Sequence, residues 1–331
     1  MTARETVAVA HPNIALIKYW GKRDEHLVLP FNDSLSLTLD VFPTTTRIRL
    51  DPDATVDQFV IDGRAARGEV LHRATEFLAL VRERAARQER AVVDTRNTVP
   101  LGAGLASSAS GFAALAMAAA QAYGLSLSAT QLSRLARRGS GSAARSVFGG
   151  FVLWHAGDPD APDPDLSSYA EAVTDTRLDT ALVAVVLDAG PKAVSSREAM
   201  RCTVATSPLY QGWVTDSRAD LVRMRTALRN GDMACVGEIA ERNALGMHRA
   251  MEAAWPAVRY RSPASHTVLH HVRRLRKEGV GAWATMDAGP NVKVLCASAD
   301  AEQVAERMRE VTARVVVARS GPGARLAAVT S

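Results

Sequence analysis

Hydrophobic and polar residues follow two different spacings in the first hundred residues. Apolar residues alternate with polar ones in SLSLTLD (34–40) and TRIRL (46–50), and this spacing of two predicts strands. QFVIDG (58–63) continues the pattern and ends at Asp-Gly, which predicts a turn. Residues 68–88 instead carry apolar side chains at helical spacing. This part of the chain is therefore expected to be strands with one helix.

Strands and helices continue to mix after residue 90. The segment AVVDTRNTV (91–99) predicts a strand that leads into a glycine- and serine-rich segment, 100–111, and then into an alanine-rich helix. Ser128 has the position of an N-cap for a second helix, with Gly139 just past its end. The strand FVLWHA precedes GDPDAPDPD (157–165), which we expect to be an exposed loop.

The latter half is predicted to be richer in helices. Strands and helices occur in both halves without regular βαβ order, so the fold class expected is α+β rather than a doubly wound sheet. We expect two domains, residues 1–185 and 186–331. The elements predicted here are a strand at 181–187, helices at 216–230, 232–252 and 264–278, a hairpin formed by 281–286 and 291–297, a helix at 300–313 and a strand at 314–318.

Composition describes an ordinary globular chain. Its 331 residues are 47% hydrophobic, enough to form two packed domains. Lys and Arg outnumber Asp and Glu by 40 to 35, and aromatic residues make up 5%. A nucleic-acid-binding protein would be expected to cluster its basic residues and to interleave them with aromatic ones. A positively lined cleft for a polyanionic small molecule fits the same numbers, and no nucleic acid partner is expected.

The cysteines and the apolar runs bear on location. Cys202, Cys235 and Cys296 are odd in number and far apart, so they predict neither a disulfide framework nor a metal site. A reducing, cytoplasmic setting is therefore expected. Charged residues interrupt the N-terminus before a signal sequence could form, and the longest apolar run, 112–120, is too short to span a bilayer. No membrane role is expected.

PLGAGLASSASG (100–111) stands immediately before the alanine-rich helix. Bare backbone N–H groups and a positive helix end both attract anions, so this segment predicts a phosphate site. It lacks the Gly-Lys-Ser/Thr of a Walker A loop and has Ser107 where a dinucleotide fingerprint needs its third glycine. The alternative is a glycine loop that only caps a buried helix.

HPNIALIKYWGKRDE (11–25) places a lysine among large apolar residues. In an extended chain, Leu16, Lys18 and Trp20 share one face, and Ile17 and Tyr19 share the other. A desolvated ammonium group is costly unless it is paired with an anion, which favours a functional lysine. The alternative is a lysine at a strand end whose ammonium group reaches water.

Two further segments carry chemistry. RRGSGSAARS (137–146) combines small residues with Arg145, whose planar guanidinium suits a carboxylate or phosphate; a flexible surface turn is the alternative. In ATMDAGPNVKVL (284–295), Asp287 follows an apolar strand at a turn where its carboxylate can face a cleft. The alternative for Asp287 is a local Asx turn. The string DAGP occurs twice, at 188–191 and 287–290.

These segments together resemble the GHMP kinases, and within that superfamily the mevalonate diphosphate decarboxylase family. NIALIKYWGKRDE, GLASSASGFAAL, GSGSAARSVFGGF and MDAGPN follow the family's pattern in the same order, from about residue 8 to 296. The resemblance implies a two-domain GHMP kinase fold. Its N-terminal domain would be like ribosomal protein S5 domain 2, and its C-terminal domain would be ferredoxin-like. Relatives are commonly homodimers, so a homodimer is expected.

The resemblance also implies a reaction. ATP, with Mg²⁺, phosphorylates the tertiary 3-hydroxyl of mevalonate 5-diphosphate, and loss of phosphate and CO₂ gives isopentenyl diphosphate. Asp287 would remove the hydroxyl proton or orient the hydroxyl, and Lys18 would neutralise charge beside it. Arg145 would hold the substrate carboxylate.

The resemblance extends to binding residues. The substrate-binding residues it implies are Tyr19, Trp20, Gly21, Lys22, Arg73, Ser140, Gly141, Ser142, Ala143, Ala144, Arg145, Ser195, Ser196 and Arg197. The residues implied for ATP are Gly102, Gly104, Leu105, Ala106, Ser107 and Ser108, with Ser107 or Ser108 also near Mg²⁺.

The chain departs from the family pattern at two positions, Asp33 and Ala144. Neither removes a charged residue implied in catalysis. Three alternatives remain: a GHMP-type kinase that stops at phosphorylation, a decarboxylase of a related 3-hydroxy acid such as phosphomevalonate, and a non-catalytic ligand sensor. Arg145 argues against the first, and the presence of both Lys18 and Asp287 argues against the last.

Overall fold

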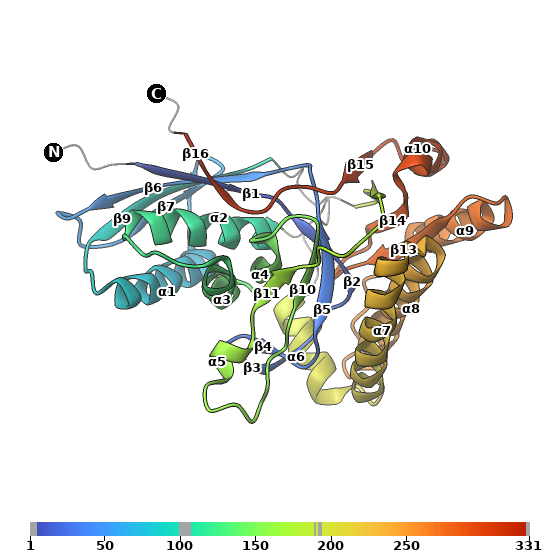
Figure 1. The fold of residues 1–331 in the computed structure, drawn as a ribbon, viewed down its shortest axis with the longest axis horizontal. Coiled ribbons are helices and arrows are strands. Elements are labelled where there is room, and N and C mark those ends of the chain that lie inside the picture. The colour runs from blue at the N-terminus through green and yellow to red at the C-terminus, as the bar shows by residue number, and fades with distance from the viewer. Residues whose placement is uncertain (1–4, 99–106, 189, 191–193, 329–331) are drawn as a thin grey trace.

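The computed structural model describes residues 5–98, 107–188, 190 and 194–328. In this part of the chain the strands form three larger sheets and a two-stranded ribbon. Figure 1 shows the first sheet and its helices at one end, the helices of residues 210–309 at the other, and a central sheet between them. The α+β class predicted from the sequence is confirmed.

The first sheet is built mainly from the first hundred residues. In spatial order, its strands are β16 (Arg325–Ala327), β1 (Thr6–Ala10), β6 (Thr44–Asp51), β9 (Arg90–Asn97), β7 (Gln58–Ile61) and β8 (Arg64–Ala65).

Three helices cover one face of this sheet: α1 (Gly68–Ala85), α2 (Ser107–Ala122) and α3 (Ala129–Gly139) (Figure 1). The buried residues of α2 are mostly alanines, whose small side chains let the helix lie close to β1 and β6. Ser128 caps α3 through a capping box with Gln131, as predicted. The predicted Asp-Gly turn joins β7 to β8, and both of its residues have positive φ.

The central sheet is antiparallel. Its strands, in spatial order, are β11 (Ala170–Ala172), β10 (Phe151–Trp154), β5 (Ser34–Thr38) and β2 (Asn13–Ile17), and the ribbon of β3 (Lys22–Asp24) and β4 (Leu29–Pro30) follows β2 in the chain.

Both faces of the central sheet are covered, so every residue of β2 is buried. One face packs against α7 (Tyr210–Asn230) and α8 (Met233–Glu252), and the short helix α4 (Ala143–Ser146) contacts β5 and β10. β2 ends at Ile17, one residue before Lys18. The two faces predicted for the residues around Lys18 therefore do not separate a buried side from a solvent-exposed side.

The third sheet combines strands from the latter half in the order β13-β14-β12-β15, all antiparallel. The hairpin predicted at 281–297 is confirmed as the pairing of the first two. Its strands are β12 (Thr180–Val185), β13 (Ala282–Met286), β14 (Val292–Ala297) and β15 (Val315–Arg319), and α9 (Pro263–Lys277) and α10 (Ala301–Arg309) cover one face.

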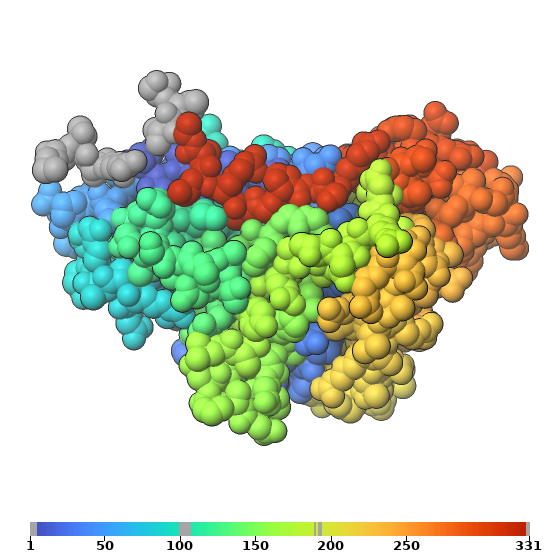
Figure 2. Space-filling view, viewed as in Figure 1, coloured from blue at the N-terminus to red at the C-terminus, as the bar shows by residue number. Residues whose placement is uncertain are grey.

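The end of the chain returns to its beginning. β15 pairs with β12, and β16 then pairs with β1, so the C-terminal segment crosses the molecule, as the red segment in Figure 2 shows. Gly321 lies on this path, where a Cβ would stand 2.0 Å from the carbonyl oxygen of Leu39. The two halves thus exchange strands, and the expected domain limits at 185 and 186 stay a prediction.

The cysteines and the described helices bear on the expected setting of the protein. The three cysteines are free. Among the described helices, none combines the length and the apolar character needed to cross a membrane.

Candidate active site

A cavity of about 1310 Å³ collects most of the segments singled out in the sequence. Its wall includes residues that follow β2, one face of α1, the start of α2 and the end of α3. From the latter half it includes Asp287 and the beginning of α6 (Ser196–Thr206). Segments far apart in the sequence therefore share one cleft.

Lys18 and Asp287 form an ion pair at this cavity. The Lys18 Nζ donates to Asp287 Oδ1 at 2.7 Å, and the lysine side chain is 1% exposed while the aspartate side chain is 29% exposed. The Lys18 backbone is also fixed, because its N–H donates to Asn243 Oδ1 and its carbonyl accepts from Asn32 Nδ2. The alternative of a lysine that reaches water does not fit this burial.

Burial and pairing act in opposite directions on these two groups. Burial lowers the pKa of Lys18 to about 8, although Asp287 raises it. Burial would raise the pKa of the Asp287 carboxyl, but the ammonium groups of Lys18 and Lys293 lower it below its ordinary value. At neutral pH the site therefore holds a carboxylate beside an ammonium group.

Arg145 lies in α4 and is 3% exposed. Its Nε donates to Asn13 Oδ1 at 3.2 Å and its Nη1 donates to Ser34 Oγ at 2.6 Å. Burial lowers the pKa of Arg145 to about 10, so it stays charged at neutral pH. Its Nη2 has no hydrogen-bond partner among the described residues. Because Arg145 lines the cavity, this nitrogen is available as a donor to a bound anion.

The segment before Arg145 joins the two serine-rich regions. Ser140 donates to Ser108 at 3.4 Å between hydroxyl oxygens, which links the end of α3 to the start of α2. A Cβ on Gly141 would stand 2.9 Å from both Tyr19 and Trp154, so this position requires glycine for close approach. Ser140, Gly141 and Ser142 line the cavity; Ala143 and Ala144 are fully buried away from it, and their contact with substrate stays a prediction.

Basic side chains from three elements line another part of the wall. Lys22 Nζ donates to Glu25 at 2.7 Å, and Arg73 Nη2 donates to the Gly139 carbonyl at 2.8 Å. Arg197 Nη1 donates to Glu69 at 2.8 Å. Four further residues predicted to bind substrate line the cavity: Tyr19, Trp20, Ser195 and Ser196. Ser195 is also the N-cap of α6. Gly21 does not line the cavity; it has φ +95° and lies beside Tyr210.

Two family models match the chain in succession. Residues 10–170 match the diphosphomevalonate decarboxylase-like N-terminal domain, and residues 181–320 match the mevalonate 5-diphosphate decarboxylase C-terminal domain. The chain belongs to the mevalonate diphosphate decarboxylase family. The resemblance read from the sequence motifs is therefore confirmed.

Relatives and solved structures agree with this membership. The diphosphomevalonate decarboxylase mvd1 of Aspergillus fumigatus is 34% identical over 94% of this chain and 81% of its own length. A phosphomevalonate decarboxylase of Haloferax volcanii is 33% identical over 92% of each chain. The Enterococcus faecalis mevalonate diphosphate decarboxylase has a TM-score of 0.91 at 43% identity, and the Staphylococcus aureus enzyme 0.93 at 38%; coverage is 98% and 99% of each chain, respectively.

The residues predicted to bind ATP and Mg²⁺ lie at and just before the start of α2. A solved complex of MDDEF with MVAPP, AMPPCP and magnesium is 44% identical to this chain over 98% of both, with a TM-score of 0.91. Here Ser107 and Ser108 are exposed at the cavity, whereas the predicted ATP-binding Gly102, Gly104, Leu105 and Ala106 lie outside the described residues. The described residues contain no cluster of three His, Cys, Asp or Glu for a metal. Serine hydroxyls do fit an ion that is held mainly by phosphates and water.

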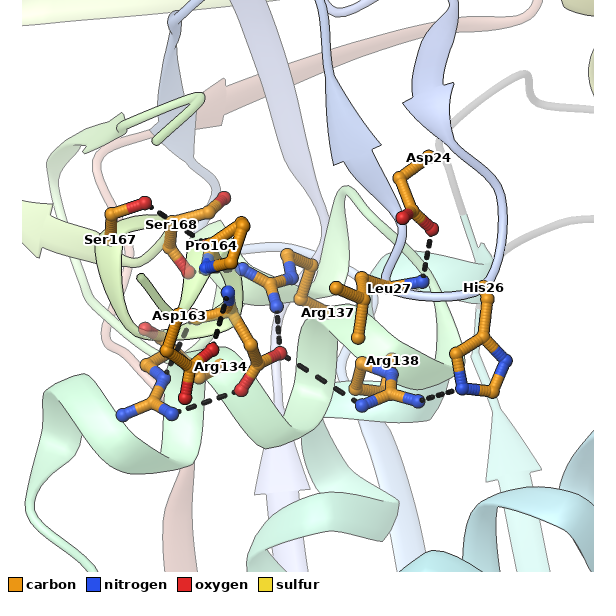
Figure 3. A network of polar contacts seen from close by, with 12 residues as sticks. Asp24, His26, Leu27, Arg134, Arg137, Arg138, Asp163, Pro164, Ser167 and Ser168 are labelled. Atoms are coloured by element: carbon orange, nitrogen blue, oxygen red, sulfur yellow. Dashed lines mark hydrogen bonds and ion pairs between the residues drawn. The ribbon is translucent and has the colours of Figure 1, made fainter. Parts of the chain in front are cut away.

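Asp165, placed by sequence in an exposed loop, is in fact buried. It lies in α5 (Pro164–Ser167), and its carboxylate accepts hydrogen bonds from Arg137, which is fully buried, and from Arg134 at 2.9 Å. Figure 3 labels both arginines together with Arg138. Arg138 lies 3.9 Å from the same carboxylate, and it also contacts His26 at the cavity. Asp165 is buried because its carboxylate neutralises the basic end of α3, which leads into Ser140, whereas positions 158–160, 162 and 163 of the same segment are exposed as predicted.

The motifs of the family did not assign a role to several residues that hold the site. Asn243 fixes the Lys18 backbone, and Asn13 and Ser34 fix Arg145. Lys293 contacts the second oxygen of Asp287. For Lys293 the sequence did carry a signal, a lysine between valines in a predicted strand.

Proposed function

We propose that this chain catalyses the ATP-dependent decarboxylation of mevalonate 5-diphosphate to isopentenyl diphosphate, with ADP, phosphate and CO₂ as the other products. The observation that carries the proposal is the ion pair between the buried Lys18 and Asp287, which faces a cavity shared with Arg145 and two serine-rich segments. A tertiary hydroxyl is a poor nucleophile and a poor leaving group. It therefore needs a carboxylate to orient or deprotonate it, and then conversion to a phosphate ester.

The first step forms a bond between the 3-hydroxyl oxygen and the γ-phosphorus of ATP, and ADP leaves. Asp287 would accept the hydroxyl proton or hold it in a hydrogen bond. Lys18, 2.7 Å from Asp287, would keep that carboxylate ionised and offset the charge of the transferred group. The Ser107 and Ser108 hydroxyls would hold the Mg²⁺ that accompanies ATP and offsets phosphate charge.

The second step breaks the bond between C3 and the phosphate oxygen. The electron pair of the C1–C2 bond forms the new C2=C3 double bond, and C1 leaves as CO₂. Arg145 would orient the C1 carboxylate through Nη2, because its other contacts already fix the guanidinium plane. A kinase that stops at phosphorylation has no need of this group.

Lys22, Arg73 and Arg197 support a diphosphate on the substrate. They converge on the wall that also carries Tyr19 and the Ser140–Ser142 segment. A second candidate is phosphomevalonate, favoured by the similarity to the Haloferax volcanii phosphomevalonate decarboxylase. The same wall could bind one phosphate, so the substrate preference is decided by experiment.

We also propose a cytoplasmic homodimer. The three free cysteines support a reducing compartment, and the family resemblance supports the dimer. Sedimentation equilibrium of the purified protein tests the oligomeric state: a mass twice that of the 35.4 kDa chain is expected, and a single-chain mass would contradict the proposal.

A substrate comparison tests the proposed reaction. The protein is incubated with ATP and Mg²⁺ and, separately, with mevalonate 5-diphosphate or mevalonate 5-phosphate, and ADP, phosphate and CO₂ are followed together. We expect the three products in equal amounts, with a higher kcat/KM for the diphosphate. ADP without CO₂ would indicate a kinase, and a preference for the monophosphate would favour the second candidate.

A further inference from the structure

Both oxygens of the Asp287 carboxylate are held by buried lysines. Lys18 Nζ donates to Oδ1 at 2.7 Å, and Lys293 Nζ donates to Oδ2 at 3.4 Å. The side chain of Lys293 is 2% exposed. The carboxylate thus lies between two ammonium groups on different elements, which restricts rotation of its plane.

Lys293 comes from a firmly held part of the third sheet. It lies in β14, opposite Thr285 of β13 and Ala184 of β12. Asp287 instead lies in the turn that joins β13 to β14. A contact from a central strand therefore fixes a side chain that the turn alone would leave less constrained.

We infer that Lys293 is a positioning residue for the reaction, because it holds Asp287 Oδ2 and so directs the carboxylate toward Lys18 and the substrate hydroxyl. The inference rests on the proposed function of Asp287. Lys293 is not among the described residues that line the cavity, so its effect would pass through Asp287 rather than through contact with substrate.

The charges around this pair give the inference a specific signature. Asp287 and Lys18 face Lys293 on β14, Arg145 on α4 and His248 on α8, and burial keeps the pKa of His248 at about 3. The positive charges of Lys293 and Arg145 lower the pKa of Lys18. Removal of the Lys293 charge should therefore raise the pKa of Lys18 and move the alkaline limb of the pH profile to higher pH.

The test compares Lys293→Met, Lys293→Gln and Lys293→Arg with the wild-type protein. The control is Lys277→Met, on the exposed last turn of α9. A misdirected carboxylate should lower kcat about 10- to 100-fold with little change in KM for the substrate. In the Met and Gln variants the alkaline limb of the pH profile should also move to higher pH. Lys293→Arg keeps the positive charge, so its alkaline limb should stay at the wild-type pH.

A melting temperature that falls in the Met and Gln variants, with kcat and the limb unchanged, would show a merely structural lysine and overturn the inference. A second readout does not depend on turnover. NMR titration of ¹⁵N-labelled lysine ammonium groups should show a higher pKa for Lys18 in Lys293→Gln than in wild type, and an equal pKa would also overturn it. An inactive wild-type protein would instead contradict the proposed function, so the two failures are distinguishable.

Discussion

Lys18 Nζ and Asp287 Oδ1 lie 2.7 Å apart although the two residues are 269 positions apart in the chain. One residue follows β2 of the central sheet and the other lies in the turn after β13 of the third sheet. α8 packs against both strands and supplies Asn243, which holds the Lys18 backbone. The pair that we propose for catalysis therefore depends on how these two sheets pack around α8.

Titration of Lys18 should limit activity at alkaline pH. Its pKa is lowered to about 8, so the ammonium charge is present below that pH and is lost as pH rises through it. Because kcat/KM reports the free enzyme, its alkaline limb should lie near pH 8. Bound phosphates favour the ammonium form, so the limb of kcat should lie higher. A kcat/KM profile that stays flat to pH 10 would contradict this assignment.

Arg145→Lys should weaken substrate binding despite keeping the charge. A lysine has a single nitrogen, so it cannot reproduce the separate contacts of Nε and Nη1 and also supply the donor that Nη2 offers. Loss of a charged hydrogen bond costs about 1.5–3 kcal/mol, so KM for the substrate should rise by about 10- to 100-fold. Steady-state kinetics with saturating ATP measures this, and an unchanged KM would exclude Arg145 from carboxylate binding.

Asp165→Asn should destabilise the fold near the substrate loop. The change leaves Arg137, which is fully buried, without its carboxylate. Breaking a buried ion pair by removing one partner costs about 3–5 kcal/mol, and urea unfolding should show a loss of that order. Asp160→Asn, on an exposed position of the preceding loop, is the matched control and should stay within about 0.5 kcal/mol of wild type. Equal stability of the two variants would mean that the arginine cluster is solvated.

Gly21→Ala tests the backbone that presents Lys22. Gly21 has φ +95°, and a Cβ there would stand 2.2 Å from the Tyr210 hydroxyl oxygen. Tyr210 itself is held, because it donates to the Trp20 carbonyl at 2.7 Å. We expect a loss of at least about 1–3 kcal/mol in the free energy of unfolding. Gly212→Ala, in a helix with open space around it, should instead be neutral or stabilising by up to about 1 kcal/mol. A neutral Gly21→Ala would contradict the close approach.

The sequence identified the charged residues that stand inside distinctive motifs. Lys18 and Arg145 stand beside apolar or small residues, Asp287 follows an apolar strand at a turn, and the resemblance to the family implies the catalytic role of all three. The α+β class also followed from local spacing. Spacing and motifs depend on neighbours in the chain, so the sequence carries them directly.

Features that depend on distant partners were not predictable in this way. Asn243 acts on a residue 225 positions away, and nothing in its own helix marks that contact. The Pro- and Asp-rich segment predicts an exposed loop, but its last residue, Asp165, is buried because it pairs with the fully buried Arg137 of α3. The return of β16 to β1 likewise depends on long-range pairing.

The role of Asp287 is tested most directly by Asp287→Asn. The asparagine keeps the size of the side chain but loses the charge that pairs with Lys18 and orients or deprotonates the hydroxyl. ADP formation with mevalonate 5-diphosphate is compared with substrate affinity measured by calorimetry, and Asp216→Asn on the exposed face of α7 is the control. We predict a loss of about 10²- to 10⁴-fold in ADP formation, with affinity within a few-fold of wild type. Full ADP formation in Asp287→Asn would contradict the account.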